Sequence, residues 1–285
     1  NRGFEFEIRG NNFKIGDFNL GFNANLTTNK NEVLALGGGQ DQIIANAGGM
    51  DFLTRIGGSI AEFYAYDIQG VYRTQEQLDS ETIIPLNGTE VGDYVVRDVD
   101  GDGKITTDDR TTLGQYNPEY TYGFGFNFSY KGFYLNAQFT GIEGRKVFDS
   151  MLWGSESGEG FQMPTQYFFD NYFSPRNPDG FFRRPDYSSF SSAARLTRFS
   201  SLSVHDADYF RLRSIQVGYT FQQEINKYLG LDTLRIYLTG NNIFNITDFR
   251  GYNSEGISSQ ALTRGAIGSS GPLTRFVAAG LNVKF

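Results

Sequence analysis

The chain has 285 residues, of which 39% are hydrophobic and 16% aromatic, and its formal net charge is −7 at pH 7. This acidic balance argues against nucleic acid as a partner, because phosphate backbones attract basic patches. Cysteine is absent, which excludes disulfides, thiolate metal sites and cysteine nucleophiles.

The composition favours strands over helices. The chain contains 27 Phe, 17 Tyr and 35 Gly but only 3 Met, a usage typical of β-structure. Mean hydropathy is −0.39, and we find no uninterrupted apolar run of roughly 18 residues, which excludes a transmembrane helix. A transmembrane β-barrel stays compatible with these values, because alternation dilutes its apolar residues.

Two strands are predicted at the start of the chain. The first places apolar side chains on one face and charged side chains on the other: Phe4, Phe6 and Ile8 against Glu5, Glu7 and Arg9. A short turn is expected at residues 10–12. A second strand is expected over 13–29, with a change of register at Gly16-Asp17, because the alternation of apolar residues loses phase there.

A very long connection follows, over residues 30–117. Within it, residues 60–66 and 70–72 are expected to form a small extracellular hairpin. Counting them as a spanning strand would break the alternation of strand directions along the chain. We therefore assign them to the loop and not to the membrane.

An acidic segment at 98–109 has the ligand spacing of an EF-hand calcium loop, which uses oxygen donors at positions 1, 3, 5, 7 and 12 and a glycine at position 6. Ile105, at the eighth position, is expected to anchor the loop to apolar neighbours. The alternative is a solvated acidic turn, although carboxylates this close repel one another unless they are neutralised. We therefore expect a calcium ion with a structural role, held by Asp98, Asp100, Asp102, the backbone carbonyl of Lys104, and Asp109.

The clearest strand runs from 119 to 131. A Lys131-Gly132 turn leads from it into a partner strand over 133–140, which predicts a hairpin. Both strands are long enough to cross a bilayer, at roughly 9–11 tilted residues. In the first strand, aromatic residues share one face and small or polar residues the other: Tyr120, Tyr122, Phe124, Phe126, Phe128 and Tyr130 against Thr121, Gly123, Gly125, Asn127 and Ser129.

A soluble β-sandwich with a buried aromatic face would explain one such hairpin equally well. The pattern recurs, however, in strands over 215–221, 234–244 and 273–285. A bulge or crossing point is expected near Arg213, where the alternation changes phase. Short and long connections alternate between the strands, which is the arrangement of outer-membrane barrels.

The predicted strands number about seven, whereas single-chain bacterial barrels have an even number and an unclosed sheet edge cannot face lipid. We therefore expect further strands before Asn1. The absence of a signal peptide at Asn1 agrees with this expectation, because an exported protein normally begins with one. If the C-terminus lies in the periplasm, every short turn lies on the periplasmic side.

The rival functions are an enzyme and an independent small barrel. An enzyme would depend on a single histidine, His205, and its adjacency to Asp206 does not make a catalytic triad. We interpret His205 as a loop residue at a strand entrance and expect no enzymatic activity. An independent small barrel, acting as a pore or an adhesin, would need an eighth strand and pairing of the first strand with the last.

Several blocks of sequence carry a resemblance that spans nearly the whole chain. They are Asn1-Arg2-Gly3-Phe4-Glu5, 57–72, Gly92-Asp93-Tyr94, Asn117-Pro118-Glu119-Tyr120-Thr121-Tyr122-Gly123, Tyr130-Lys131-Gly132-Phe133, Asp208-Tyr209-Phe210-Arg211-Leu212-Arg213 and Gly240-Asn241-Asn242-Ile243-Phe244-Asn245-Ile246-Thr247. As an ordered set they resemble the C-terminal barrel half of SusC-like (SusC/RagA) TonB-dependent outer-membrane transporters. One departure is Asn253-Ser254-Glu255, where the family usually reads Asp-Pro-Glu, and another is the lack of a plug domain and a TonB-contacting segment.

The resemblance implies that residues 1–285 form the C-terminal part of an all-β, antiparallel transmembrane barrel of about 22 strands. About seven of those strands, with long extracellular loops, would lie in this chain. Such a barrel is filled by an N-terminal plug and capped by a SusD-like surface lipoprotein. It lies in the outer membrane of a Gram-negative bacterium and imports oligosaccharides, or sometimes peptides, with energy from TonB and the proton-motive force.

Aromatic residues of the second long loop, over 147–205, are candidate solute-binding residues, because an aromatic surface suits the apolar face of a sugar ring. The alternative for each is packing within the loop or contact with a partner, and for any single residue the alternative is favoured. The candidates are Trp153, Phe161, Tyr167 and Tyr172.

Overall fold

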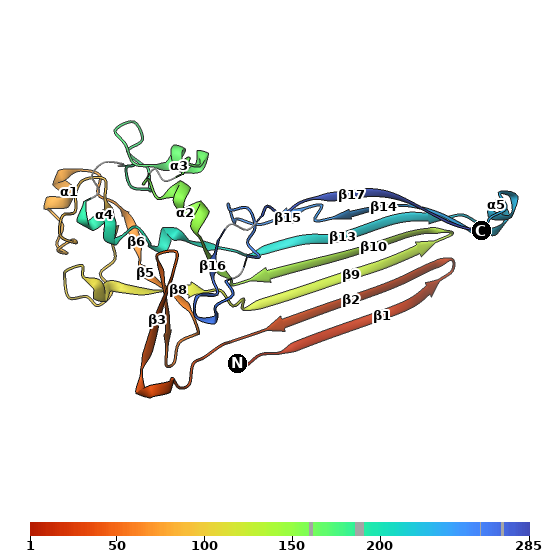
Figure 1. Ribbon diagram of the computed structural model, residues 1–285, viewed down its shortest axis with the longest axis horizontal. Helices are drawn as coiled ribbons and strands as arrows, with labels where there is room; N and C mark the ends of the chain where they lie inside the picture. Colours follow the sequence, from red (N-terminus) through yellow and green to blue (C-terminus); the bar gives the residue numbers. More distant parts are fainter. Residues whose placement is uncertain (160–161, 186–190, 257, 269–270) are drawn as a thin grey trace.

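The computed structural model describes residues 1–159, 162–185, 191–256, 258–268 and 271–285. Its main feature is a long antiparallel sheet whose seven spanning strands lie side by side in chain order (Figure 1). They are β1 (Glu5–Ile15), β2 (Phe18–Thr28), β9 (Tyr120–Tyr130), β10 (Phe133–Glu143), β13 (Tyr209–Thr220), β14 (Thr233–Asn241) and β17 (Phe276–Lys284). A short strand, β15 (Asn245–Ile246), also pairs with β13. The predicted number of strands is confirmed.

The two ends of this strand order remain apart. β1 pairs with β2, and β17 pairs with β14, so that β1 and β17 form opposite edges of the sheet. Within the described part of the chain, no strand joins these edges. The closed small barrel that an independent pore or adhesin requires is therefore not formed by these residues.

The two faces of the sheet differ in polarity. Phe6, Phe126, Ile236 and Leu281 are representative of one face, and all four side chains are exposed. A soluble β-sandwich would bury this aromatic face beneath a second sheet. The exposure of these side chains contradicts that alternative and is typical of the lipid-facing surface of a membrane barrel.

β1 runs without interruption through the turn that was expected at residues 10–12. The register between β1 and β2 shifts between Gly10 and Phe13, and Asn12 has a positive φ of 59°. One extra residue in β1 makes this a bulge, and it returns Phe13 and Ile15 to the apolar face. The predicted turn was wrong because glycine and asparagine are common both in bulges and in turns, so these residues do not distinguish the two.

Three short connections lie together at one end of the sheet, beside the C-terminus (Figure 1). Gly16-Asp17 is the turn between β1 and β2, and not the register change that was predicted. Lys131 and Gly132 join β9 to β10 with φ values of 45° and 92°, the two positive φ values that a type I′ hairpin turn needs. The third connection contains α5 (Gln223–Tyr228). Short turns at the same end as the C-terminus confirm the predicted strand directions.

A second bulge lies at Arg213, as predicted, and the pairing of β13 with β10 shifts register there. β14 ends opposite this bulge at Asn241, and the N–H of Asn242 donates to the carbonyl of Arg213 at 3.1 Å. The strands predicted over 234–244 and 273–285 are consequently a few residues shorter in the structure.

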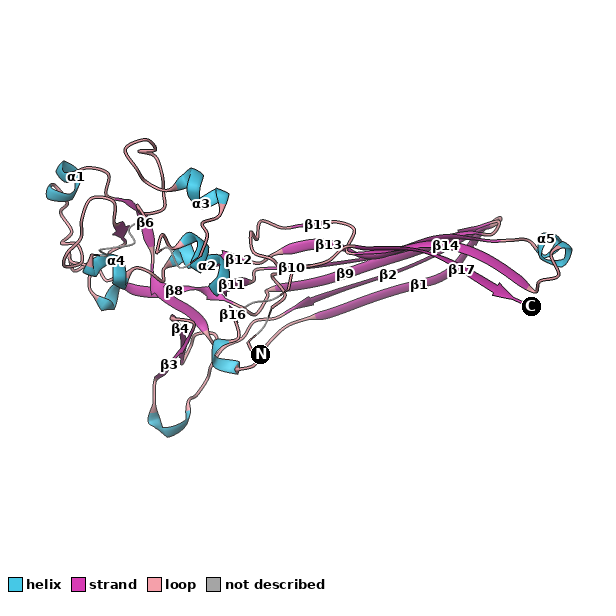
Figure 2. Cartoon of the chain, turned by 45° about the horizontal axis from the view of Figure 1, so that its top comes forward, coloured by secondary structure: helices cyan, strands magenta, loops and turns pink. Residues whose placement is uncertain are grey.

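The three long connections fold together into a layer at the opposite end of the sheet (Figure 2). It contains a four-stranded sheet in the order β3-β4-β5-β8, a pair formed by β6 and β7, and a three-stranded sheet in the order β12-β11-β16. The strands are β3 (Gln42–Ala47), β4 (Met50–Arg55), β5 (Glu62–Tyr66), β6 (Ile68–Val71), β7 (Tyr94–Val96), β8 (Arg110–Gln115), β11 (Lys146–Asp149), β12 (Val204–Asp206) and β16 (Ala266–Ile267).

The hairpin expected from residues 60–66 and 70–72 was wrong in its pairing. β5 pairs with β4 and β8, whereas β6 pairs with β7. Both strands do lie outside the spanning sheet, as expected.

Short helices complete the loop layer: α1 (Gln75–Asp79), α2 (Ser150–Glu156), α3 (Gln166–Asn171) and α4 (Ser192–Leu196). No helix in the described ranges is long and apolar enough to cross a membrane.

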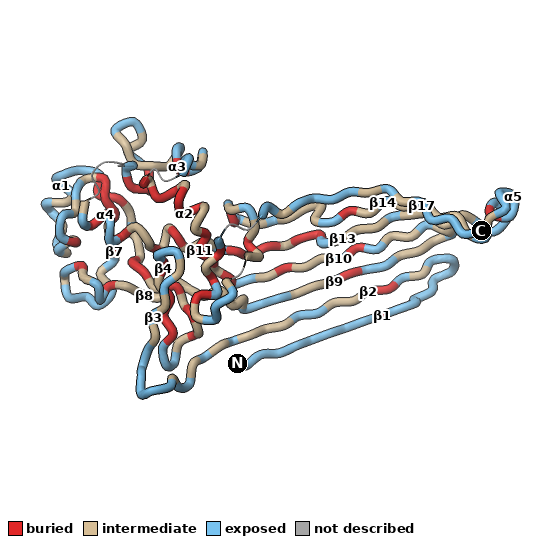
Figure 3. Tube along the Cα trace, viewed as in Figure 1, coloured by how far each residue is buried: buried red, intermediate tan, exposed pale blue. Residues whose placement is uncertain are grey.

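Buried side chains concentrate in the loop layer and are sparse in the spanning sheet (Figure 3). The largest fully buried side chains include Phe52, Phe63 and Phe148, which belong to one apolar cluster. The loops therefore have a core of their own, whereas the sheet is a single layer that needs its surroundings to cover it. This packing holds the loop segments in defined positions above the sheet.

Candidate functional site

The predicted calcium loop is shaped by two glycines. Gly101 and Gly103 have positive φ values of 76° and 83°, a conformation that glycine adopts without steric cost. Gly103 occupies the sixth position, where EF-hand loops turn sharply. Asp98 accepts hydrogen bonds from the backbone N–H groups of both glycines, at 2.7 and 3.0 Å.

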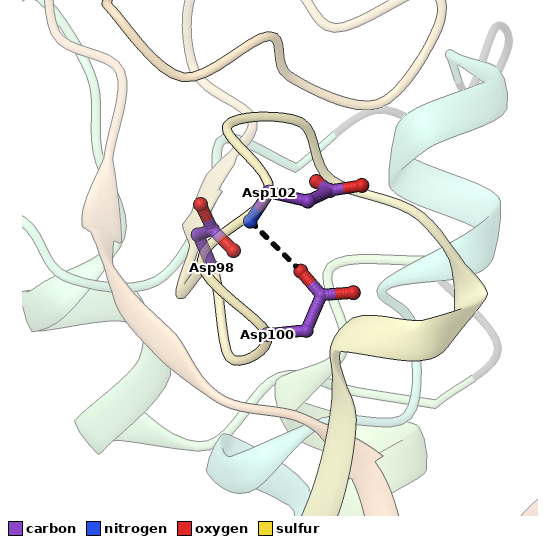
Figure 4. Close-up of side chains that lie close together, drawn as sticks. All are labelled: Asp98, Asp100 and Asp102. Carbon is purple, nitrogen blue, oxygen red and sulfur yellow. Dashed lines mark hydrogen bonds between the residues drawn. The ribbon is translucent and has the colours of Figure 1, made fainter.

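This turn brings three carboxylates together (Figure 4). Each of Asp98, Asp100 and Asp102 offers an oxygen within 4.8 Å of the others. Oxygen ligands at about 2.3–2.6 Å from one calcium ion are at most about 5 Å apart, so the three carboxylates fit a common ion. The ammonium of Lys104 lies 3.3 Å from Asp102 and partly offsets the local negative charge.

Asp109 is the ligand predicted at the twelfth position of the loop. It is fully buried, one of its oxygens accepts the N–H of Val99, and the other accepts the N–H of Thr106, both at 2.7 Å. In the described part of the chain, Asp109 does not belong to the group of three carboxylates. It connects the beginning and the end of the loop and holds the loop closed.

The apolar anchor predicted at Ile105 is confirmed. Ile105 is buried in a cluster with Tyr66, Leu86 and Val96. Its N–H also donates to the carbonyl of Ile84 at 2.7 Å. The acidic loop is thus fastened to the core of the loop layer by Ile105, while Asp100 and Asp102 are exposed.

Among the candidate aromatic residues, Trp153 lies within the core of the loop layer. Its indole N–H donates to the carbonyl of Arg198 at 2.9 Å, and its ring stacks on Phe199 with centroids 4.6 Å apart. These contacts occupy both the polar group and one face of the indole. They match the packing alternative given for this residue.

Tyr167 and Tyr172 lie at α3, away from the core position of Trp153. Tyr167 is 39% exposed, and the guanidinium of Arg250 lies over its ring at 3.9 Å. Tyr172 stacks on Phe168 with centroids 5.8 Å apart. The fourth candidate, Phe161, lies outside the described residues. Binding of a solute by these aromatic residues stays a prediction.

His205 lies on β12, where it pairs with Val147 of β11. Burial lowers the pKa of His205 to about 4, so the imidazole is neutral at physiological pH. Within the described ranges, the three aspartates of the acidic loop are the only group of acidic or histidine side chains close enough to share a metal ion. His205 is therefore not part of a metal cluster formed by these residues.

The third long loop is anchored to the sheet by Glu255, a contact that sequence reasoning missed. The guanidinium of Arg211 lies 2.7 Å from one Glu255 oxygen, and the hydroxyl of Tyr209 donates to the other at 2.8 Å. A guanidinium of Arg145 also donates to the carbonyl of Ser254 at 2.7 Å. The only signal in the sequence was the departure at 253–255, where glutamate still ends the block.

Glu255→Gln is expected to loosen the third loop. Burial alone would raise the pKa of Glu255, but hydrogen bonds from Arg211 and Tyr209 outweigh it and lower the pKa below its ordinary value. The stability that the anchor contributes is therefore fully present at pH values above the ordinary pKa of a glutamate, and it is lost as the pH falls through the lowered pKa of Glu255. Hydrogen exchange over 250–256, corrected for its intrinsic pH dependence, should lose protection in acid.

In the Glu255→Gln variant, protection over the same residues should already be low at neutral pH and change little in acid. Glu224→Gln, at the exposed α5 at the other end of the sheet, is the matched control and should behave as wild type. Equal protection in wild type and Glu255→Gln at neutral pH would contradict the anchoring role.

The inner face of the sheet is hollowed below the loop layer. The hollow has a volume of about 710 Å³. Polar side chains from neighbouring strands dominate its lining, among them Asn23, Asn25, Gln138, Thr140 and Ser214. Hydroxyl and amide groups at this position are suited to hydrogen bonding with a polar solute or with another protein segment.

No protein-family model matches the chain. Among curated proteins, TonB-dependent receptor P3 of Formosa agariphila is 31% identical over 297 residues, covering 100% of this chain and 28% of that receptor. Over its whole length, the chain is therefore homologous to part of a TonB-dependent receptor. TonB-dependent receptors P26 and P39 of the same organism are each 27% identical and also align with 100% of the chain. The chain spans 28–30% of the length of these three receptors.

Solved structures show the same fold. The RagAB peptide transporter matches with a TM-score of 0.74 at 18% identity, covering 99% of this chain and 29% of that chain. The RagAB peptide importer in the closed-closed state matches with a TM-score of 0.71 at 19% identity and the same coverage. The seven-stranded sheet and its loops therefore have the fold of part of the RagAB peptide transporter.

Proposed function

We propose that this chain forms barrel wall and surface loops of a TonB-dependent importer in the outer membrane of a Gram-negative bacterium. The proposal is carried by the open sheet of seven spanning strands, with an exposed apolar outer face and a polar inner face. The homology with TonB-dependent receptors supports it. The long loops then face the cell exterior and the short turns face the periplasm.

The open edges of the sheet support a larger barrel. β1 and β17 each have a strand partner on only one side among the described residues. Unpaired backbone groups cost several kcal/mol each in lipid, so a spanning sheet must close on itself. We propose that further strands complete a barrel of about 22 strands, with a plug domain inside it.

The partners and the solute follow from the same proposal. TonB supplies energy through the plug domain, and a SusD-like surface lipoprotein docks on the loop layer. The packed core of the loops supports docking, because it presents a fixed surface to a partner. The solute is a peptide or an oligosaccharide, and the polar hollow of the inner face lies where such a solute would pass. Tyr167 is the most exposed of the aromatic candidates that the structure describes and is our first choice for solute contact.

We also propose that the acidic loop binds calcium with a structural role. Asp98, Asp100 and Asp102 would each supply a carboxylate oxygen, and the Lys104 carbonyl would supply a fourth ligand. Asp109 would be the ligand at the twelfth position, and its oxygens, which also accept the N–H groups of Val99 and Thr106, hold the ends of the loop together. Bound calcium would neutralise the clustered negative charge and stiffen a very long loop.

Uptake by whole cells tests the proposed import. Cells that lack the gene for the complete transporter should fail to grow on peptides or on oligosaccharides as the sole nutrient, and the intact gene should restore growth. A proton uncoupler should stop uptake of a labelled solute of that class. Unchanged growth on both nutrient classes, together with uptake that is insensitive to the uncoupler, would contradict TonB-driven import and favour a passive pore.

A further inference from the structure

α5 carries an apolar side that stays exposed at the short-turn end of the sheet. Ile225, Tyr228 and Leu229 lie three and four residues apart, a spacing that places side chains on one side of a helix. They are 43%, 90% and 51% exposed. Three large apolar side chains are thus gathered on one short segment, and all three are exposed.

Hydrogen bonds made by Asn226 fix the orientation of α5 relative to the sheet. Asn226 is buried, its side-chain amide donates to the carbonyl of Phe221 at 3.2 Å, and its own carbonyl accepts the N–H of Leu231 at 2.8 Å. These bonds tie α5 to the ends of β13 and β14. Lys227 is exposed, and the helical spacing places it on the side away from the apolar residues, whereas Glu224 lies at the edge of the apolar side, four residues before Tyr228.

α5 follows an aromatic rim on the outer face of the sheet. The centroids of Phe133 and Tyr219 lie 4.6 Å apart, and those of Tyr219 and Phe221 lie 5.1 Å apart. Only one residue separates Phe221 from the start of α5. Aromatic girdles of this kind mark the membrane interface in outer-membrane barrels. Four of the rim residues form one row across neighbouring strands: Phe18, Tyr130, Phe133 and Tyr219.

We propose that α5 is an interfacial anchor that lies in the phospholipid headgroup layer at the short-turn end of the barrel. Ile225, Tyr228 and Leu229 would contact the acyl boundary, while Lys227, on the far side of α5, would remain in water. This inference rests on the proposed membrane barrel and adds a contact to it beyond the spanning strands.

Lipid suits this surface better than a protein partner for two reasons. The aromatic rim reaches Phe221, which is followed after one residue by α5, so the apolar side chains of α5 begin close to the rim in the chain. Tyrosine, with an apolar ring and a polar hydroxyl, is enriched where one end of a side chain is dry and the other wet. Lys227 adds a cation that attracts the phosphate groups of anionic lipids.

Spin labelling of the complete transporter tests the anchor. The chain contains no cysteine, so single cysteines can be placed at Leu229, Lys227 and Val217 once any cysteines elsewhere in the transporter are replaced. Each labelled protein is inserted into vesicles of phosphatidylethanolamine and phosphatidylglycerol. Collision of the label with oxygen reports lipid, and collision with a water-soluble nickel complex reports water.

The label from Leu229→Cys should collide with the nickel complex several-fold less than the label from Lys227→Cys, and more often with oxygen. Equal nickel collision at the two positions would overturn the anchor, and so would shielding of the Leu229 label from both reagents, which would mean that protein covers α5. Val217→Cys, on the outer face of β13, checks the barrel separately. If its label lacks oxygen collision, the membrane barrel itself fails, whatever the result at α5.

Discussion

Phe126→Arg is expected to prevent assembly of the protein into the outer membrane. Phe126 lies near the middle of β9 on the exposed apolar face, opposite Phe22 on β2 and Ala137 on β10. An arginine at the bilayer midplane on the lipid face of a barrel costs about 2–4 kcal/mol, which is a large share of a typical folding free energy of about 5–15 kcal/mol. The amount of folded protein in outer-membrane fractions, measured by its heat-dependent gel mobility, should fall several-fold.

Asn127→Arg provides the matched control for this substitution. Asn127 is the next residue of β9 and faces the polar side, where it pairs with Gly21 and Asn136. The same charge placed there stays in contact with water or with polar groups, so the amount of folded protein should remain near that of wild type. An equal loss for both variants would indicate general damage to the strand, and normal assembly of Phe126→Arg would show that the outer face does not meet lipid.

Combined replacement of Asp98→Asn and Asp100→Asn is expected to abolish calcium binding by the acidic loop. Calcium affinity in loops of this type depends on the number of charged ligands, and the double variant keeps only Asp102 of the three grouped carboxylates. Isothermal titration of the complete transporter should lose one binding event. Limited proteolysis over 84–109 should become faster, and a chelator should have the same effect on wild type.

Asp108→Asn is the control for the calcium experiment. Asp108 lies in the same loop and is exposed, but it is outside the group of three carboxylates. Its replacement removes a negative charge without removing a proposed ligand, so the binding event and the protease resistance should persist. If the chelator leaves the proteolysis of wild type unchanged, calcium has no structural role in this loop.

The spanning strands could be predicted because alternation is a local property of the chain. Successive side chains of any extended segment point to opposite faces, so the strand at 119–131 and the change of phase at Arg213 were both visible in the sequence. The same reasoning failed at residues 10–12. The residues at these positions are compatible with a turn and with a bulge, and only the pairing of β1 with β2 distinguishes the two.

The strand pairing of the loop layer could not be predicted from local sequence patterns, for a related reason. β5 was expected to pair with its neighbour in sequence, but its partner β8 lies more than forty residues further along the chain. Asp109 was expected to bind a metal ion from the spacing of carboxylates alone. The structure shows that its oxygens accept the N–H groups of Val99 and Thr106, a geometry that spacing does not reveal.

The sequence by itself determined the all-β class, the polarity of the two faces and the sharp turn of the acidic loop, because each depends on residues a few positions apart. Only the tertiary structure decided which loop segments pair, where the sheet stays open, and how Arg211 holds Glu255 at 2.7 Å. These contacts join residues that are distant in the chain. Their formation depends on the packing of whole loops against one another and not on the conformation of any one segment.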